Sequence, residues 1–134
     1  SGPLGFLTTH TIKPLWQNFY PKHASLLIAL DAKNSHKNLT QKPLAALLLL
    51  FWEKFAYYWM AAATPLGKKN FAPTILVWEA FQLAKKRGCR SFDFEGVYDE
   101  RYPKLNRNWL GFTKFKQGFG GKEVYYPQPL RLIL

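Results

Sequence analysis

Apolar residues recur along the first part of the chain with two different periods, which predicts a helix followed by a strand. Residues 8–20 carry an apolar side chain every three or four positions, the spacing of one helix face. We expect Pro14 in the first turn of this helix, because a proline there leaves no backbone bond unmade. Pro21 ends the helix, and the short apolar run at 23–30 (HASLLIAL) then predicts a strand.

The longest apolar stretch, residues 43–63, is about as long as a membrane-spanning helix. Its centre carries Glu53 and Lys54, and each charge there would cost about 2.5–3.5 kcal/mol on insertion. The stretch therefore divides into two apolar runs, 43–52 and 55–63. Continuous apolar runs are typical of strands covered on both faces, so we expect a hairpin, with one buried or spanning helix as the alternative.

The clearest element is a helix that begins near Pro73, a residue suited to a first helical position. Apolar residues form one broad face, basic residues fill the last turn, and Gly88 follows as a left-handed stop. Residues 64–72 before this helix are expected to be a loop. The alternating segment 91–97 after it predicts a strand, and helix, short link and strand make half of a β–α–β unit.

The last third of the chain is more polar. Residues 98–108 form an expected loop in which Asp99-Glu100-Arg101 is most simply a salt-bridged run. Residues 109–117 are amphipathic and predict a helix, glycines then break the chain, and 122–134 is expected to be a final apolar strand region. These elements together predict a mixed α/β (α+β) fold with helices beside a sheet.

Composition narrows the classes of partner. The chain has 134 residues, enough for one domain, and is 48% hydrophobic, so it can bury a core. Its formal net charge of +11 favours an anionic partner, meaning a nucleic acid, a phosphorylated ligand or a membrane surface. The single cysteine, Cys89, excludes a disulfide within the chain, and a reducing cytoplasm is the simplest compartment.

The spacing of residues excludes several common nucleotide-binding, hydrolase and metal-binding motifs. The sequence contains no Walker loop, no G-x-G-x-x-G fingerprint and no G-x-S-x-G elbow. His10, His23 and His36 lack the spacing of metal ligands, so no metal site is expected. Asp93 and Glu95, on one face of the predicted strand, could form an acid–base pair, although a solvated or lysine-paired face is the alternative.

Residues 109–122 (WLGFTKFKQGFGGK) form the most distinctive segment. Lys114 and Lys116 flank Phe115, and a glycine-rich turn follows. Lys116 stands four residues after Phe112, so its stem would lie against the aromatic side of a helix. A cation held in a cleft there would stabilise an oxyanion or hold a phosphate. An ordinary basic surface helix is the alternative.

Two segments, APTILVWEAFQLAKKRGCRSFDFEG (72–96) and GFTKFKQGFGG (111–121), resemble the Fem family of peptidoglycan-bridge aminoacyltransferases. The matching residues are Trp78, Glu79, Ala80, Ala84, Lys85, Gly88, Asp93, Phe94, Gly96, Gly111, Phe115, Lys116, Phe119, Gly120 and Gly121. The resemblance implies a fold like that of the GNAT acyltransferases, a mixed sheet with flanking helices. It implies a single domain over residues 1–134 that corresponds to the C-terminal half of a two-half enzyme.

The resemblance also implies an activity, the transfer of an amino acid from aminoacyl-tRNA to the peptide amine of a lipid-linked or nucleotide-linked peptidoglycan precursor. Lys116 would be the catalytic cation, and Asp93 or Glu95 would position the attacking amine. The expected substrate-binding residues are Lys68, Lys69, Lys114, Phe115, Gly120 and Gly121. No metal or other cofactor is needed, because the donor ester is already activated. The expected location is the cytoplasm, including the inner face of the membrane.

Two other functions stay open. A GNAT-type N-acyltransferase would use acyl-CoA, but such enzymes carry Q/R-x-x-G-x-G/A before the long helix. Here the loop TPLGKKNFA has one glycine, Gly67, and has Thr64 where Gln or Arg is needed. Lys68 and Lys69 in that loop could instead meet a phosphate backbone. The remaining possibility is a non-catalytic basic module that binds RNA or anionic lipid.

Overall fold

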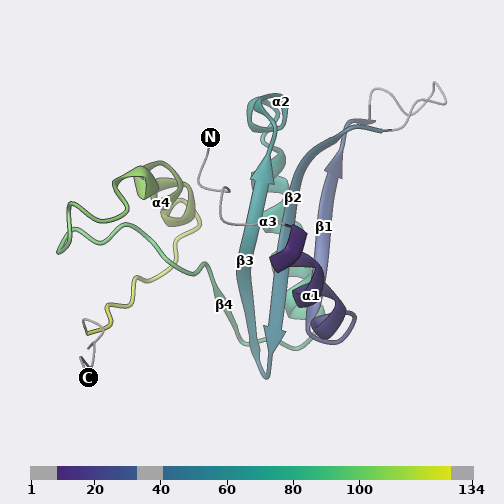
Figure 1. The fold of residues 1–134 in the computed structure, drawn as a ribbon, viewed down its shortest axis with the longest axis horizontal. Coiled ribbons are helices and arrows are strands. Elements are labelled where there is room, and N and C mark those ends of the chain that lie inside the picture. Colours follow the sequence, from purple (N-terminus) through teal and green to yellow (C-terminus); the bar gives the residue numbers. More distant parts are fainter. Residues whose placement is uncertain (1–8, 33–40, 128–134) are drawn as a thin grey trace. The chain divides into compact units, whose positions relative to one another are not determined.

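The computed structural model describes residues 9–32 and 41–127 (Figure 1). The chain divides into two compact units, one ending at Glu95 and the other beginning at Gly96. Each is described by itself below. The expectation of a single domain stays a prediction.

The first unit is built on a four-stranded mixed sheet in the order β1-β2-β3-β4. Its strands are β1 (Ala24–Leu30), β2 (Pro43–Trp52), β3 (Phe55–Ala63) and β4 (Ser91–Asp93). The pairs β1–β2 and β2–β3 are antiparallel, and β3–β4 is parallel. The predicted hairpin is therefore confirmed, and Glu53, with a φ of 52°, and Lys54 form its turn. The fold class predicted from the sequence, a mixed sheet flanked by helices, is also confirmed.

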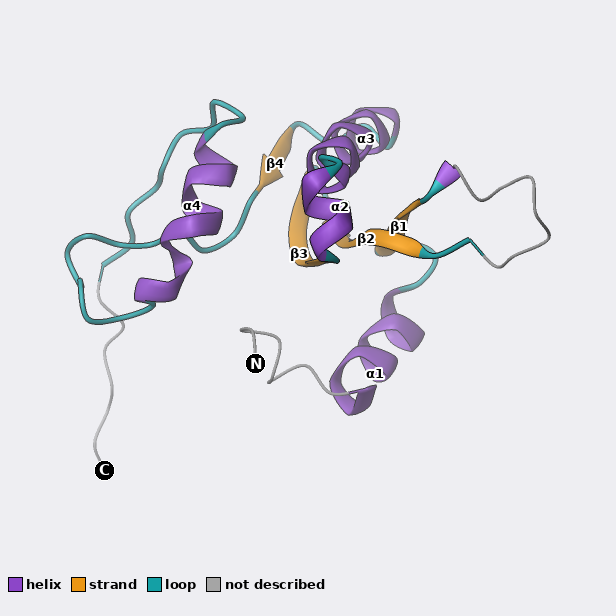
Figure 2. Cartoon of the chain, turned by 90° about the horizontal axis from the view of Figure 1, so that it is seen from above, coloured by secondary structure: helices purple, strands orange, loops and turns teal. Residues whose placement is uncertain are grey.

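The described residues of this unit form the helices α1 (Thr9–Phe19), α2 (Pro65–Lys69) and α3 (Ala72–Lys86). Figure 2 shows α3 on one side of the sheet and α1 on the other. The apolar face of α3 buries Leu76 and Ala80 against Leu47, Leu49 and other side chains of β2. Burial of this apolar surface is the main force that holds helix and sheet together.

The end of α3 follows the sequence prediction closely. Gly88 adopts a φ of 75°, a left-handed conformation that costs glycine little. The backbone N–H of Gly88 donates to the Lys85 carbonyl, and that of Cys89 donates to the Ala84 carbonyl, both at 3.0 Å. These two bonds form a Schellman motif, which satisfies carbonyls at the end of the helix and directs the chain into β4.

Two predictions near the amino-terminal end and the long helix were wrong. Pro14 lies inside α1, not in its first turn, because the helix already begins at Thr9. Residues 64–72 are not a simple loop, because α2 forms within them. Thr64 caps α2 by accepting a hydrogen bond from the Gly67 N–H at 3.0 Å. Threonine followed by proline is a signal for the start of a helix, but the turn-like composition of residues 64–72 favoured a loop.

Two predicted strands also differ from the structure. The strand expected at 91–97 ends at Asp93, because Glu95 has a φ of 61° and leaves the extended conformation. The final strand region expected at 122–134 shows no strand over residues 122–127, and residues 128–134 lie outside the described part of the chain. Pro127 and the glycines before this segment do not favour a regular ladder.

The second unit contains a short 3-10 turn (Arg107–Trp109) that leads directly into α4 (Leu110–Gln117). The helix predicted over 109–117 is therefore confirmed within one residue. Among residues 9–32 and 41–127, no helix has both the length and the apolar character needed to cross a membrane.

Candidate functional site

Lys116 lies on the inner side of α4, and only 8% of its surface is exposed. Its ammonium donates a hydrogen bond of 2.7 Å to the carbonyl oxygen of Gly96. The same nitrogen lies 4.8 Å from the centre of the Phe112 ring, one helical turn earlier. The spacing of four positions therefore does bring Lys116 next to Phe112, through its ammonium nitrogen. Burial and these contacts hold a positive charge in one position, where it can interact more strongly than in water.

Thr113 is a second buried polar residue on the same face of α4, and sequence reasoning missed it. Its hydroxyl oxygen accepts a hydrogen bond of 2.8 Å from the Tyr98 backbone N–H. Residues three positions apart lie side by side on a helix, so Thr113 and Lys116 both face the segment 96–98. The T-x-x-K spacing was visible in the sequence, but nothing in it showed which backbone these side chains would meet.

Gly96 allows close packing at this point. A Cβ atom added there would lie 2.7 Å from Cζ3 of Trp109, closer than real Cβ contacts. The Trp109 ring in turn lies 5.3 Å from the Phe112 ring, measured between centroids. A glycine therefore lets the indole approach the backbone whose carbonyl accepts the Lys116 hydrogen bond.

The other predicted residues near α4 lie closer to the surface. Phe115 is half-buried, with its ring edge-on to Phe119 at 5.2 Å between centroids. Lys114, Gly120 and Gly121 are exposed, and Gly120 has a φ of 77°. The glycine turn thus reverses the chain directly after the helix that carries Lys116.

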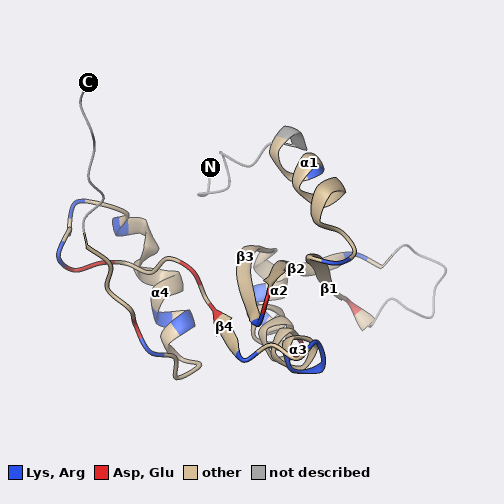
Figure 3. Cartoon of the chain, turned by 90° about the horizontal axis from the view of Figure 1, so that it is seen from below, with Lys and Arg blue, Asp and Glu red and all other residues tan. Residues whose placement is uncertain are grey.

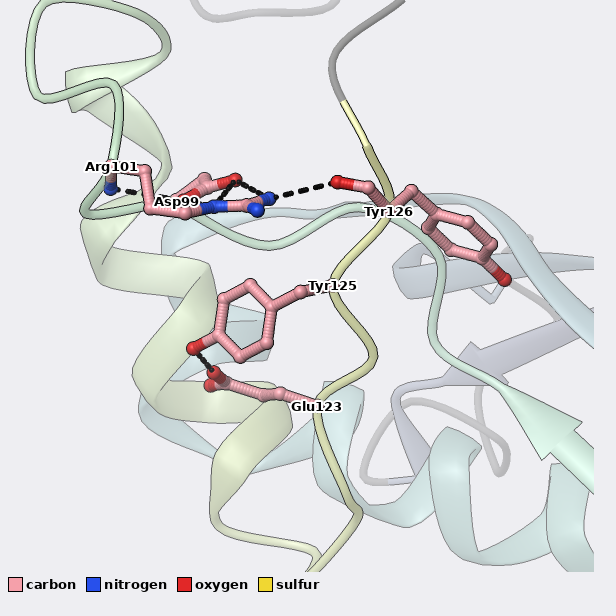
Figure 4. Close-up of polar contacts among 5 residues, drawn as sticks. All are labelled: Asp99, Arg101, Glu123, Tyr125 and Tyr126. Carbon is pink, nitrogen blue, oxygen red and sulfur yellow. Dashed lines mark hydrogen bonds and ion pairs between the residues drawn. The ribbon is translucent and has the colours of Figure 1, made fainter.

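Beyond the turn, residues 123–126 lie against the loop that follows Gly96 (Figure 4). Arg101 forms an ion pair with Asp99 at 2.7 Å and donates to the Tyr126 carbonyl at 3.1 Å. This confirms the salt-bridged loop, and the hydrogen bond from Arg101 holds the pKa of Asp99 below its usual value. The Tyr125 hydroxyl donates to Glu123 at 2.7 Å, a bond that raises the pKa of the phenol.

The two candidate carboxylates lie in the first unit, at the end of β4. Oδ1 of Asp93 accepts a hydrogen bond of 2.7 Å from the Glu95 N–H, which shapes the turn that ends the strand. Both side chains are exposed. They do not share one strand face as expected, because the extended chain ends between them. Their catalytic role stays a prediction.

Lys68 and Lys69 occupy the last turn of α2 and are exposed. Gly67 before them is buried, and it packs so closely on β2 that a Cβ there would collide with the Leu44 carbonyl oxygen. Thr64 also donates a hydrogen bond of 3.2 Å to that oxygen, so α2 rests directly on β2. Lys68 and Lys69 therefore lie on a short helix that packs directly against β2.

No group of histidine, cysteine and acidic side chains suited to a metal ion occurs among residues 9–32 and 41–127. Nδ1 of His23 lies 3.0 Å from the Phe51 carbonyl oxygen. His36 and the side chain of His10 lie outside the described residues. Cys89 is half-buried against the core.

The mixed sheet and its flanking helices are consistent with an α/β acyltransferase-like fold. Residues 22–127 match the model of the FemAB family. The chain belongs to the FemAB family, as the two sequence segments indicated. Members of this family are transferases that act in peptidoglycan synthesis, in the formation of interpeptide bridges, which implies a peptidoglycan precursor as substrate. No curated protein and no solved structure matches the chain.

Proposed function

We propose that this protein acts in the transfer of an amino acid from aminoacyl-tRNA to a peptide amine of a peptidoglycan precursor. The observation that carries the proposal is the ammonium of Lys116, buried in α4 within the segment that matches the Fem pattern. Membership of the FemAB family implies that the acceptor is a peptidoglycan precursor. The buried cation supplies a group suited to the charge that develops during acyl transfer.

The proposed reaction needs no oxidant or added activation. The amine nitrogen attacks the ester carbonyl carbon, a C–N bond forms, and the bond from that carbon to the ribose oxygen breaks. The proton lost by the amine ends on the released ribose hydroxyl. Lys116 stabilises the negative oxygen of the tetrahedral intermediate or of the leaving ribose.

The other candidate residues are proposed to bind and position the two substrates. Asp93 and Glu95 are proposed to hold the attacking amine. Lys68 and Lys69 are proposed to meet phosphates of the donor, which agrees with their exposure on α2. Lys114, Phe115, Gly120 and Gly121 are proposed to contact substrate beside Lys116.

The contacts of α2 favour a tRNA donor over acyl-CoA. A pyrophosphate grip needs several free backbone N–H groups in the turn before the long helix. Here Pro65 has no N–H, and the N–H of Gly67 is bonded to the Thr64 hydroxyl. These two positions offer no donor to a pyrophosphate.

A donor comparison tests the proposal. The full natural chain is incubated with a peptidoglycan precursor and either an aminoacyl-tRNA pool or acetyl-CoA, and the precursor is examined by mass spectrometry. We expect a mass increase of one aminoacyl residue with the tRNA pool, abolished by ribonuclease. A product with acetyl-CoA alone would establish the GNAT-type activity instead. Binding of tRNA without product from either donor would favour the non-catalytic module.

A further inference from the structure

One end of the sheet in the first unit gathers exposed cations from three separate segments of the chain. They are Lys22 before β1, Lys54 in the turn between β2 and β3, and Lys85, Lys86, Arg87 and Arg90 around the end of α3. We call these six residues the cationic end. Figure 3 shows Lys and Arg gathered at the tip of α3 and beside the start of β4.

Hydrogen bonds to backbone carbonyls bring the three segments together. The N–H groups of Arg90 and Ser91 donate to the Lys54 carbonyl at 2.7 and 3.2 Å. Nη1 of Arg87 donates to the Lys22 carbonyl at 3.2 Å. The grouping therefore follows from the fold, not from chance positions of long side chains.

The helix end alone does not account for this charge. Lys85, Lys86 and Arg87 are the ordinary complement of a helix carboxyl end. Lys22, Lys54 and Arg90 lie outside the helix and add like charge to the same place. The only carboxylate in the segments 22–25, 51–55 and 85–91 is that of Glu53. Such an excess is typical of a surface that meets a polyanion.

Part of this surface is held in position before any partner binds. Nη2 of Arg87 donates to the Ser25 hydroxyl at 3.0 Å, and its guanidinium carbon lies 4.2 Å from the centre of the Phe51 ring. An arginine restrained in this way loses less entropy on binding. Trp52 beside the turn packs its ring against that of His23 at 5.1 Å between centroids and is still 58% exposed, so it adds an aromatic side chain on which an unpaired base can stack.

We propose that the cationic end binds the sugar–phosphate backbone of RNA, which, if the proposed function holds, is the donor tRNA. Several cations brought together by the fold, with Arg87 among them held in position, suit a polymer that carries one negative charge on each phosphate.

The test removes three charges whose side chains are exposed, by Lys54→Gln, Lys86→Gln and Arg90→Gln together. Arg87 is retained because it bonds to the fold. A matched triple, Lys104→Gln, Arg107→Gln and Lys122→Gln, removes the same charge from exposed positions in the second unit. Binding of deacylated tRNA is measured from 50 to 200 mM salt, with circular dichroism to show that each variant is folded.

We expect the first triple to raise the Kd for tRNA at least about tenfold and to reduce the salt slope by about two units, while the matched triple changes little. Equal weakening by both triples, or none by the first, would overturn the proposal. Unchanged tRNA binding with lost binding to phosphatidylglycerol–phosphatidylcholine vesicles would assign the surface to lipid. If the unaltered chain transfers amino acids from tRNA while the first triple binds tRNA normally, only this surface fails. If the unaltered chain binds no tRNA, the tRNA-dependent function fails with it.

Discussion

At the scale of single residues, Lys116 combines burial with a partner that orients its charge. A carbonyl oxygen such as that of Gly96 accepts a hydrogen bond without cancelling the charge of the ammonium. The Phe112 ring lies 4.8 Å from the same nitrogen, measured to the ring centre. The helical spacing of Lys116 and Phe112 could be predicted from the sequence. The role of Thr113 could not, because it depends on where the chain 15 residues earlier returns to α4.

Tyr58 gives a prediction at the same scale. Burial raises the pKa of its phenol to about 12, against an ordinary 10.0. The folded chain therefore keeps this proton at a pH where the unfolded chain has lost it. We expect the free energy of unfolding to fall as pH rises from 10 to 12, and that part of the fall to disappear in Tyr58→Phe. Denaturant unfolding at several pH values measures it, and an identical pH dependence in the variant would contradict the effect of partial burial on Tyr58.

At the scale of elements, the hairpin and α3 could be predicted because each carries several agreeing signals. The hairpin has long apolar runs broken by two charges, and α3 has a proline near its start, a basic last turn and a glycine stop. The helix α2 could not, because its five residues look like a loop and its stability comes from contact with β2. The strand β4 could be predicted from its alternating pattern, but its end at Asp93 could not, because it depends on the left-handed conformation of Glu95.

The contribution of Thr64 to the stability of α2 and to its contact with β2 can be tested by substitution. Thr64→Ala removes the acceptor for the Gly67 N–H and the donor to the Leu44 carbonyl. We expect a loss of about 1 kcal/mol in the free energy of unfolding, within the 0.5–2 kcal/mol usual for a cap. Urea denaturation measures it. Thr74→Ala, an exposed position inside α3, is the matched control and should be neutral or slightly stabilising. Equal effects would mean that the cap contributes nothing.

At the scale of the whole molecule, the proposed chemistry is distributed over two compact units. The second unit holds Lys116 and its supporting contacts, and the first holds Asp93, Glu95, α2 and the cationic end. The fold class, the family and the segment that carries Lys116 could be predicted from the sequence. The grouping of the six cations could not, because Lys22, Lys54 and Arg90 are far apart in sequence and meet only when the sheet forms.

The most direct test of the central claim is the single-turnover rate of aminoacyl transfer in Lys116→Met, which retains most of the stem but removes the charge. Thr113→Ala is the structural control, because Thr113 holds the same 96–98 segment and carries no charge. We predict that Lys116→Met lowers the rate by about 10²–10³ and that Thr113→Ala lowers it by less than tenfold. Equal losses, with both variants folded, would show that Lys116 only anchors this segment. An unchanged rate in Lys116→Met would contradict the account.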